Sequence, residues 1–153
     1  MHLLRLIPHV FLLAFVLALP TDSFAVSKST KKDGIAPLSV KGAVTITTEE
    51  ALTLWQKKVP FVDVRPANMY KDAHIDGAIS LPLTGGLSKQ TLGEIAGPND
   101  EVVIHCRGVN CMMGSQASKR AIKWGYTKVY YYRVGFKGWK KDGLDIIETA
   151  SKK

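Results

Sequence analysis

The sequence predicts an α/β fold with a five-stranded parallel sheet and helices on both faces of the sheet. Apolar segments of strand length alternate along the chain with segments whose apolar residues repeat at helical spacing. Two strand segments, residues 61–65 and 102–105, begin as nearly continuous apolar runs, which is typical of parallel strands covered on both faces. Right-handed crossovers between such strands gather their carboxyl ends at one edge, where open α/β sheets bind ligands.

The first half of the domain is expected to hold three strands and three helices. Thr47 and Glu50 have the spacing of a capping box, and Ser88 can cap the third helix. Gly77 gives the backbone the freedom to turn before the third strand. The strands are predicted near residues 44–46, 61–65 and 78–82, and the helices near residues 47–58, 66–73 and 88–95.

The second half centres on the strand 102–105, which ends on Cys106. A short loop, Arg107, Gly108, Val109 and Asn110, leads to Cys111, and these two are the only cysteines in the chain. A helix from about residue 115 to 124, a fifth strand at 128–132 and a turn at 135–139 into a short closing helix complete the domain. Loop N–H groups and the positive N-terminal end of the following helix stabilise a thiolate or a bound anion.

Asp63 and Arg65 form a polar pair at the end of the second strand. Because alternate strand residues point to the same side, their side chains share one face. We expect the pair to contact neighbouring chain and support the loops at the sheet edge rather than to act in catalysis.

The first 25 residues have the pattern of a secretory signal peptide. Arg5 precedes the apolar run 10–19, and the small-residue site 23–25 predicts cleavage after Ala25. The alternative is an uncleaved anchor, but Pro8 and other interruptions leave the run short of the roughly 20 apolar residues that a spanning helix needs. The sequence therefore predicts a periplasmic or secreted protein with no stable membrane span after cleavage.

The remaining chain is predicted to have three parts. Residues 26–41 are polar and read as a flexible linker, residues 42–148 as the domain, and residues 149–153 as a basic tail. The formal net charge is +8, with the cations dispersed along the chain. No aromatic-interleaved basic stripe accompanies this charge, so we expect no nucleic-acid partner, only a mild attraction for anions.

Taken together, these segments resemble the rhodanese family, sulfurtransferases with a five-stranded parallel sheet. The motifs that carry the resemblance are residues 61–66 (Phe-Val-Asp-Val-Arg-Pro), residues 74–79 (His-Ile-Asp-Gly-Ala-Ile) with Leu81-Pro82, the strand ending in Cys106, residues 125–130 (Gly-Tyr-Thr-Lys-Val-Tyr), and Gly135 with Trp139. Their order and spacing cover residues 45–139, so the resemblance implies one rhodanese-like domain.

The resemblance implies roles for the cysteine loop. Cys106 corresponds to the nucleophile that takes up a sulfane sulfur as a covalent persulfide, with no bound cofactor. Arg107, Gly108, Val109, Asn110 and Met112 correspond to the loop that binds a small sulfur-containing anion such as thiosulfate. The persulfide sulfur would pass to a thiol acceptor. Cys111 could act as a second catalytic residue that attacks Cys106 and releases sulfide, which leaves a Cys106–Cys111 disulfide for a reductant protein to reduce.

The loop also departs from its relatives at one position. Many single-domain members, and the phosphatases that share the fold, carry an arginine at the end of this loop, where Cys111 and Met112 stand here. Without that bidentate guanidinium a phosphate ester loses its main charge clamp, which disfavours a phosphatase.

Three functions remain open from the sequence. The leading hypothesis is an exported sulfurtransferase that works through a Cys106 persulfide. The second is a thiol–disulfide redox protein, which requires the Cα atoms of Cys106 and Cys111 to lie within about 7 Å. The third is a binding module that retains only the scaffold. A metal site is disfavoured, because His105 and Cys106 are adjacent on a strand and point to opposite faces.

Overall fold

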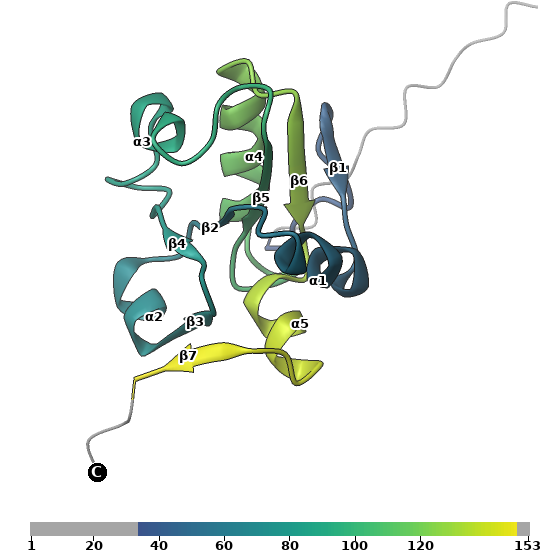
Figure 1. Ribbon diagram of the computed structural model, residues 1–153, viewed down its shortest axis with the longest axis vertical. Coiled ribbons are helices and arrows are strands. Elements are labelled where there is room, and N and C mark those ends of the chain that lie inside the picture. The colour runs from purple at the N-terminus through teal and green to yellow at the C-terminus, as the bar shows by residue number, and fades with distance from the viewer. Residues whose placement is uncertain (1–33, 150–153) are drawn as a thin grey trace, which may run out of the picture. The chain divides into compact units, whose positions relative to one another are not determined.

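A computed structural model describes residues 34–149 of the chain (Figure 1). Five strands form one sheet in the order β1-β6-β5-β2-β4, and every pairing between neighbours is parallel. From one edge to the other the strands are β1 (Ala43–Thr45), β6 (Lys128–Tyr132), β5 (Glu101–His105), β2 (Phe61–Asp63) and β4 (Ile79–Ser80). The predicted five-stranded parallel sheet is confirmed, with β5 at its centre.

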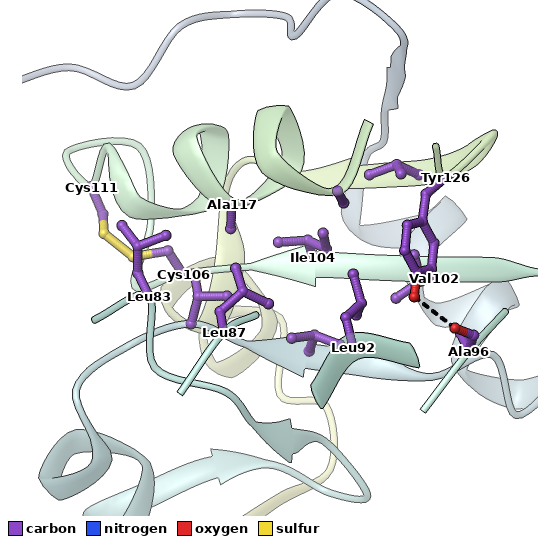
Figure 2. Close-up of a cluster of buried hydrophobic side chains, with 14 residues drawn as sticks. Leu83, Leu87, Leu92, Ala96, Val102, Ile104, Cys106, Cys111, Ala117 and Tyr126 are labelled. Atoms are coloured by element: carbon purple, nitrogen blue, oxygen red, sulfur yellow. Dashed lines mark hydrogen bonds between the residues drawn. A yellow bond between two sulfur atoms is a disulfide. The ribbon is translucent and has the colours of Figure 1, made fainter. Parts of the chain in front are cut away.

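Helices cover both faces of the sheet, as predicted. They are α1 (Thr48–Gln56), α2 (Ala67–Asp72), α3 (Lys89–Gly93), α4 (Met113–Lys123) and α5 (Gly135–Lys141). On one face, Ile104 of β5 packs with Leu92 of α3 and Ala117 of α4 (Figure 2). On the other face, the neighbouring Val103 packs with Leu54 of α1 and Trp139 of α5. Successive residues of β5 thus enter opposite cores, which is the alternation of a strand buried on both sides.

Side-chain caps mark the starts of α1 and α3, and both starts agree with the predictions. The side chains of Thr47 and Glu50 bond each other's backbone N–H groups at the start of α1, and Ser88 and Thr91 do the same at α3. No side-chain cap marks α4 or α5. Helix α4 begins two residues before the predicted start, and α5 begins at Gly135, where a turn was predicted.

A two-stranded antiparallel sheet lies apart from the main sheet and was not predicted. Its strands are β3 (Ala73–Ile75) and β7 (Ile146–Glu148), which lie side by side in Figure 1. The backbone amide of Thr149 continues the contact by donating to the Asp72 carbonyl over 2.9 Å. The predicted basic tail therefore begins with a residue that is bonded to the domain, and its remainder lies outside the described residues.

The segment before β1 differs from the predicted linker over residues 26–41. Its described part, residues 34–41, lies on the domain, with Ala36 and Val40 each only 2% exposed. These two small apolar side chains were too few to register as a core pattern in a polar segment. The rest of the predicted linker, together with the predicted signal peptide, lies outside the described residues. Within residues 34–149, no helix has the length and apolar character needed to cross a membrane.

Candidate functional site

The two cysteines lie at the carboxyl end of the central strand. Cys106 follows directly after β5, and its sulfur is bonded to that of Cys111 in a disulfide with a Cα–Cα distance of 6.4 Å. Both cysteines are buried, and they belong to the same core cluster as Leu83 and Ala117 (Figure 2). The structure therefore brings the two predicted catalytic residues together, within the distance that a disulfide requires.

Four consecutive carbonyl groups of the cysteine loop are held by hydrogen bonds. The amides of Phe136 and Lys137, in the first turn of α5, donate to the carbonyls of Cys106 and Arg107, each over 2.9 Å. Within the loop, the amide of Cys111 donates to the carbonyl of Gly108 over 2.9 Å. The fourth carbonyl, that of Val109, accepts a hydrogen bond of 2.7 Å from the amide of Ala36.

These bonds also fix the directions of the next four amides. In a trans peptide the C=O and the following N–H point in opposite directions, and all described peptide bonds are trans. The N–H groups of residues 107–110 therefore point away from the groups that hold the carbonyls. In the part of the chain that the structure describes, nothing accepts a hydrogen bond from these four amides. Loop N–H groups without a partner of this kind are donors that can bind an anion.

Close contact at Gly135 sets α5 against the loop. Gly135 has a φ of +54°, and a Cβ placed there would lie 2.2 Å from the carbonyl oxygen of Cys106. Only glycine fits at this position, because a side chain would be both strained and in collision with the backbone. The first turn of α5 is thereby close enough for its amides to reach the loop carbonyls.

Cationic side chains flank the loop on the α5 side. A pocket of about 360 Å³ lies between the loop and α5, and three of its lining residues are Arg107, Lys137 and Lys141. Of the predicted binding residues, Gly108, Val109 and Asn110 line it as well. The cations increase the local concentration of anions near the loop.

The last predicted binding residue, Met112, lies elsewhere. Met112 directly precedes α4 and its carbonyl accepts a hydrogen bond of 2.8 Å from the Ser115 hydroxyl. Its neighbour Met113 lines a second pocket, of about 250 Å³, together with Leu83 and other residues. Leu83 also packs in the cluster that contains the disulfide, so this second pocket borders that cluster.

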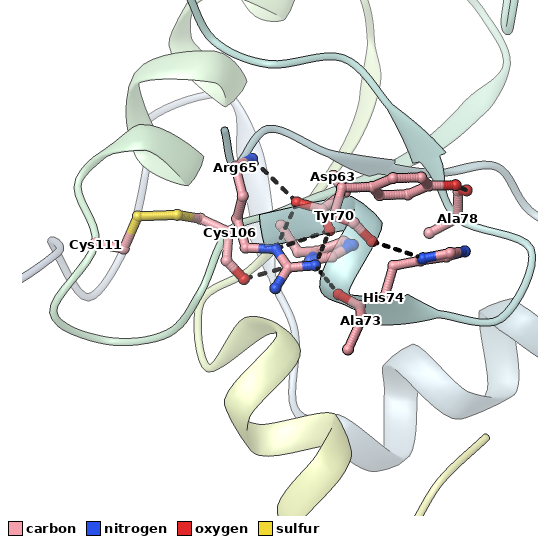
Figure 3. Close-up of polar contacts among 9 residues, drawn as sticks. Asp63, Arg65, Tyr70, Ala73, His74, Ala78, Cys106 and Cys111 are labelled. Carbon is pink, nitrogen blue, oxygen red and sulfur yellow. Dashed lines mark hydrogen bonds and ion pairs between the residues drawn. A yellow bond between two sulfur atoms is a disulfide. The ribbon is translucent and has the colours of Figure 1, made fainter. Parts of the chain in front are cut away.

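Asp63 and Arg65 form a buried ion pair beside the loop (Figure 3). Arg65 Nη2 lies 2.5 Å from Asp63 Oδ2, and the same nitrogen donates to the Ala73 carbonyl over 2.8 Å. The guanidinium also stacks on the ring of Phe136, 4.3 Å from its centroid. Because the Phe136 amide holds the Cys106 carbonyl, the pair supports the site through α5, and its bond to the Ala73 carbonyl is a contact with neighbouring chain of the expected kind.

Burial and charge act together on the ionisable groups behind Cys106. Burial alone would raise the pKa of the Asp63 carboxyl, but its interactions with His105 and Arg65, including the hydrogen bonds from Arg65, outweigh burial and lower it. Burial lowers the pKa of His105, which the Asp63 carboxylate offsets only in part. His105 is therefore a neutral ring at pH 7 and one of its nitrogens lies 3.3 Å from the Cys106 carbonyl.

Sequence reasoning missed the residues that hold the loop from outside. Phe136 and Lys137 act through their backbone amides, which any residue other than proline supplies. Ala36 does the same from a segment that was predicted to be a linker. The only sequence signal was Gly135, a glycine shortly after a strand, where a positive φ or a close approach is common.

Comparison with known proteins assigns this architecture. A family model described as Rhodanese, the rhodanese-like domain, matches residues 47–142. The chain is 31% identical over 135 residues to the HTH-type transcriptional regulator Rv0324 of Mycobacterium tuberculosis, which covers 83% of this chain and 58% of that relative. This chain thus spans little more than half of the relative's length.

Solved structures show the same fold. The BH2092 protein from Bacillus halodurans matches with a TM-score of 0.62 and 23% identity over 69% of this chain and 77% of its own. A thiosulfate sulfurtransferase from Pseudomonas aeruginosa matches with a TM-score of 0.56 and 23% identity over 69% of this chain and 20% of its own. At these identities the likeness concerns the fold.

Proposed function

This chain belongs to the rhodanese-like domain family, and on that premise we propose that it is a sulfurtransferase that carries sulfane sulfur on Cys106. The observation that carries the proposal is the set of four oriented loop amides that follow Cys106 and donate to no other described residue. Donors fixed in advance stabilise a departing anion without having to reorganise during the reaction. A sulfur donor with an anionic leaving group, such as thiosulfate, suits this arrangement.

The first half of the reaction is a displacement at sulfur. The Cys106 thiolate attacks the outer sulfur of thiosulfate, the bond between the two sulfur atoms of thiosulfate breaks, and sulfite departs with the electron pair. Cys106 is left as a persulfide anion, so the total charge is unchanged. The loop amides stabilise the negative charge that develops on sulfite, and Arg107, which lines the pocket on the α5 side, adds a positive potential near the loop.

The second half returns the enzyme to its starting state. A thiophilic acceptor, cyanide in a test tube or a thiol in the cell, attacks the outer sulfur of the persulfide and releases the Cys106 thiolate. Sulfur is carried covalently throughout, so the reaction proposed here uses no bound cofactor. Cys106 must be a free thiolate for this cycle, which requires that the disulfide to Cys111 is first reduced.

The Cys106–Cys111 disulfide supports either an additional step after persulfide formation or a redox function in place of sulfur transfer. The Cys111 thiol can attack the Cys106 sulfur of the persulfide, which releases sulfide and forms the observed Cys106–Cys111 bond. An external dithiol would then reduce that bond and become oxidised itself. If sulfur transfer is absent, the same pair supports a thiol–disulfide redox protein.

The location and partners that we propose follow from the sequence. We propose export to the periplasm or outside the cell, based on the leader pattern in the first 25 residues. Such a compartment permits disulfides and calls for a reductant protein that restores the thiols. The partners are then a small sulfur-containing anion and a protein or small-molecule thiol.

Cyanolysis of thiosulfate by the reduced protein tests the proposal. The wild type should form thiocyanate, Cys106→Ser should form none, and Cys111→Ser should retain turnover with cyanide because cyanide replaces the resolving step. Equal thiocyanate formation by the wild type and Cys106→Ser would refute a persulfide on Cys106. If the wild type forms no thiocyanate but exchanges disulfides with a dithiol, the redox function takes its place.

A further inference from the structure

A segment before β1 bonds directly to the cysteine loop. This segment, residues 34–40, is here named the strap, and it precedes the family match at residues 47–142. Ala36 and Val40 of the strap are buried on the domain. The Ala36 amide donates to the Val109 carbonyl over 2.7 Å, the shortest of the four bonds that hold the loop carbonyls.

Arg133 anchors the strap from the end of β6. Its Nε donates to the carbonyls of Ala36 and Pro37, each over 3.1 Å, and its Nη2 donates to the Ala36 carbonyl over 3.0 Å. Arg133 is partly buried and directly follows Tyr132, the last residue of β6. One guanidinium therefore fixes two successive carbonyls of the strap, a geometry that a lysine ammonium does not reproduce.

The strap determines the orientation of one loop amide. The Val109 carbonyl and the Asn110 N–H belong to the same trans peptide, so holding the carbonyl fixes the N–H in the opposite direction. Two of the other held carbonyls depend on α5 and one depends on the loop itself. Only the Val109–Asn110 peptide depends on chain that lies outside the family match.

We propose that the strap is a positioning element for the anion site, with Arg133 as its anchoring residue. Arg133 holds Ala36, Ala36 holds the Val109 carbonyl, and the Asn110 N–H is thereby kept ready for the oxyanion end of the ligand. If the bound anion is a sulfur donor, this role of the strap rests on the proposed sulfurtransferase function and extends it. If the site binds oxyanions without sulfur transfer, the role of the strap depends only on the geometry of the loop.

Variants at both ends of the strap test the proposal. Ala36→Pro removes the donated N–H, whereas Ala36→Gly keeps the N–H and serves as the matched control for lost packing. Arg133→Met removes the three hydrogen bonds by a second route, in case the proline variant does not fold. Circular dichroism and the thermal midpoint of the full-length chain establish which variants are folded.

Two measurements distinguish the strap proposal from the sulfurtransferase proposal. The first is protection of reduced Cys106 from iodoacetamide by inorganic sulfate, followed by peptide mass spectrometry. Loss of one hydrogen bond to an anion raises the half-protecting sulfate concentration about three- to tenfold in Ala36→Pro and Arg133→Met. Ala36→Gly should remain near the wild type. The second is cyanolysis, in which KM for thiosulfate should rise by a similar factor in the same two variants.

The outcomes are distinguishable. If the wild type shows no cyanolysis but sulfate protects Cys106 and the two variants weaken that protection, the sulfurtransferase proposal fails and the strap proposal holds. If sulfate does not protect Cys106 in the wild type, or if both folded variants are protected as well as the wild type, the strap proposal is overturned. Equal weakening in Ala36→Gly would also overturn it, because that variant keeps the N–H donor.

Discussion

Replacing Gly135 by alanine should separate α5 from the cysteine loop. The added Cβ would lie 2.2 Å from the Cys106 carbonyl oxygen, and backbone at that distance must move. Left-handed backbone at φ +54° costs an alanine about 1 kcal/mol more than a glycine. Moving α5 also gives up the bonds from Phe136 and Lys137, at about 1 kcal/mol each.

We therefore expect Gly135→Ala to lower the free energy of unfolding by about 3 kcal/mol, measured by urea denaturation of the full-length chain. Thiocyanate formation should fall by about tenfold or more in protein that remains folded, because the amides of Arg107 and Gly108 lose their fixed directions. The second effect depends on the proposed sulfurtransferase function, and the first does not.

Gly143→Ala is the matched control. Gly143 has a φ of +70°, but a Cβ there would meet no atom within 4 Å. This variant should lose only the conformational term of about 1 kcal/mol and keep its activity. Equal losses of stability in the two variants would refute the account of the loop contact, since strain alone would then explain both.

Three further predictions concern the buried polar groups. Asp63→Asn leaves the Arg65 guanidinium buried without its carboxylate and should cost about 3–5 kcal/mol in urea denaturation; an unchanged midpoint would contradict the role of the pair. The pKa of His105 is lowered from 6.5 in the folded chain, so the unfolded chain binds more protons and stability should fall as the pH drops below 6.5, by at most about 1.4 kcal/mol per pH unit for this group. The loss of stability per pH unit below pH 6.5, measured by denaturation, should be smaller in His105→Phe. Tyr126→Phe removes the donor to the Ala96 carbonyl and should cost about 1–2 kcal/mol by thermal denaturation, whereas full retention of stability would show that water replaces the bond.

Local patterns predicted the parts of the fold that depend on neighbours in sequence. The capping box at Thr47 and Glu50 is present, and the apolar run of β5 enters both cores. Cys106 lies at the carboxyl end of the central strand because parallel strands must end at a common edge. The supporting role expected of Asp63 and Arg65 is consistent with their buried pairing.

The remaining features depend on contacts between distant parts of the chain. The β3–β7 pair joins segments that are far apart in sequence, and neither is apolar enough to be recognised alone. The bond from Ala36 to Val109 uses only backbone atoms, which leave no residue pattern. Gly135 was visible as a glycine, but the atom that excludes a side chain there belongs to Cys106 and is known only from the fold.

Mass spectrometry of the peptide that carries Cys106 tests the central claim most directly. The experiment uses the full-length Cys111→Ser variant, in which the disulfide cannot form. This protein is reduced, freed of the reductant, incubated with thiosulfate and then digested under nonreducing conditions. We predict that the Cys106 peptide gains the mass of one sulfur atom and loses it again on addition of cyanide. A Cys106 peptide that gains no sulfur, in protein shown to be folded and reduced, would contradict the account.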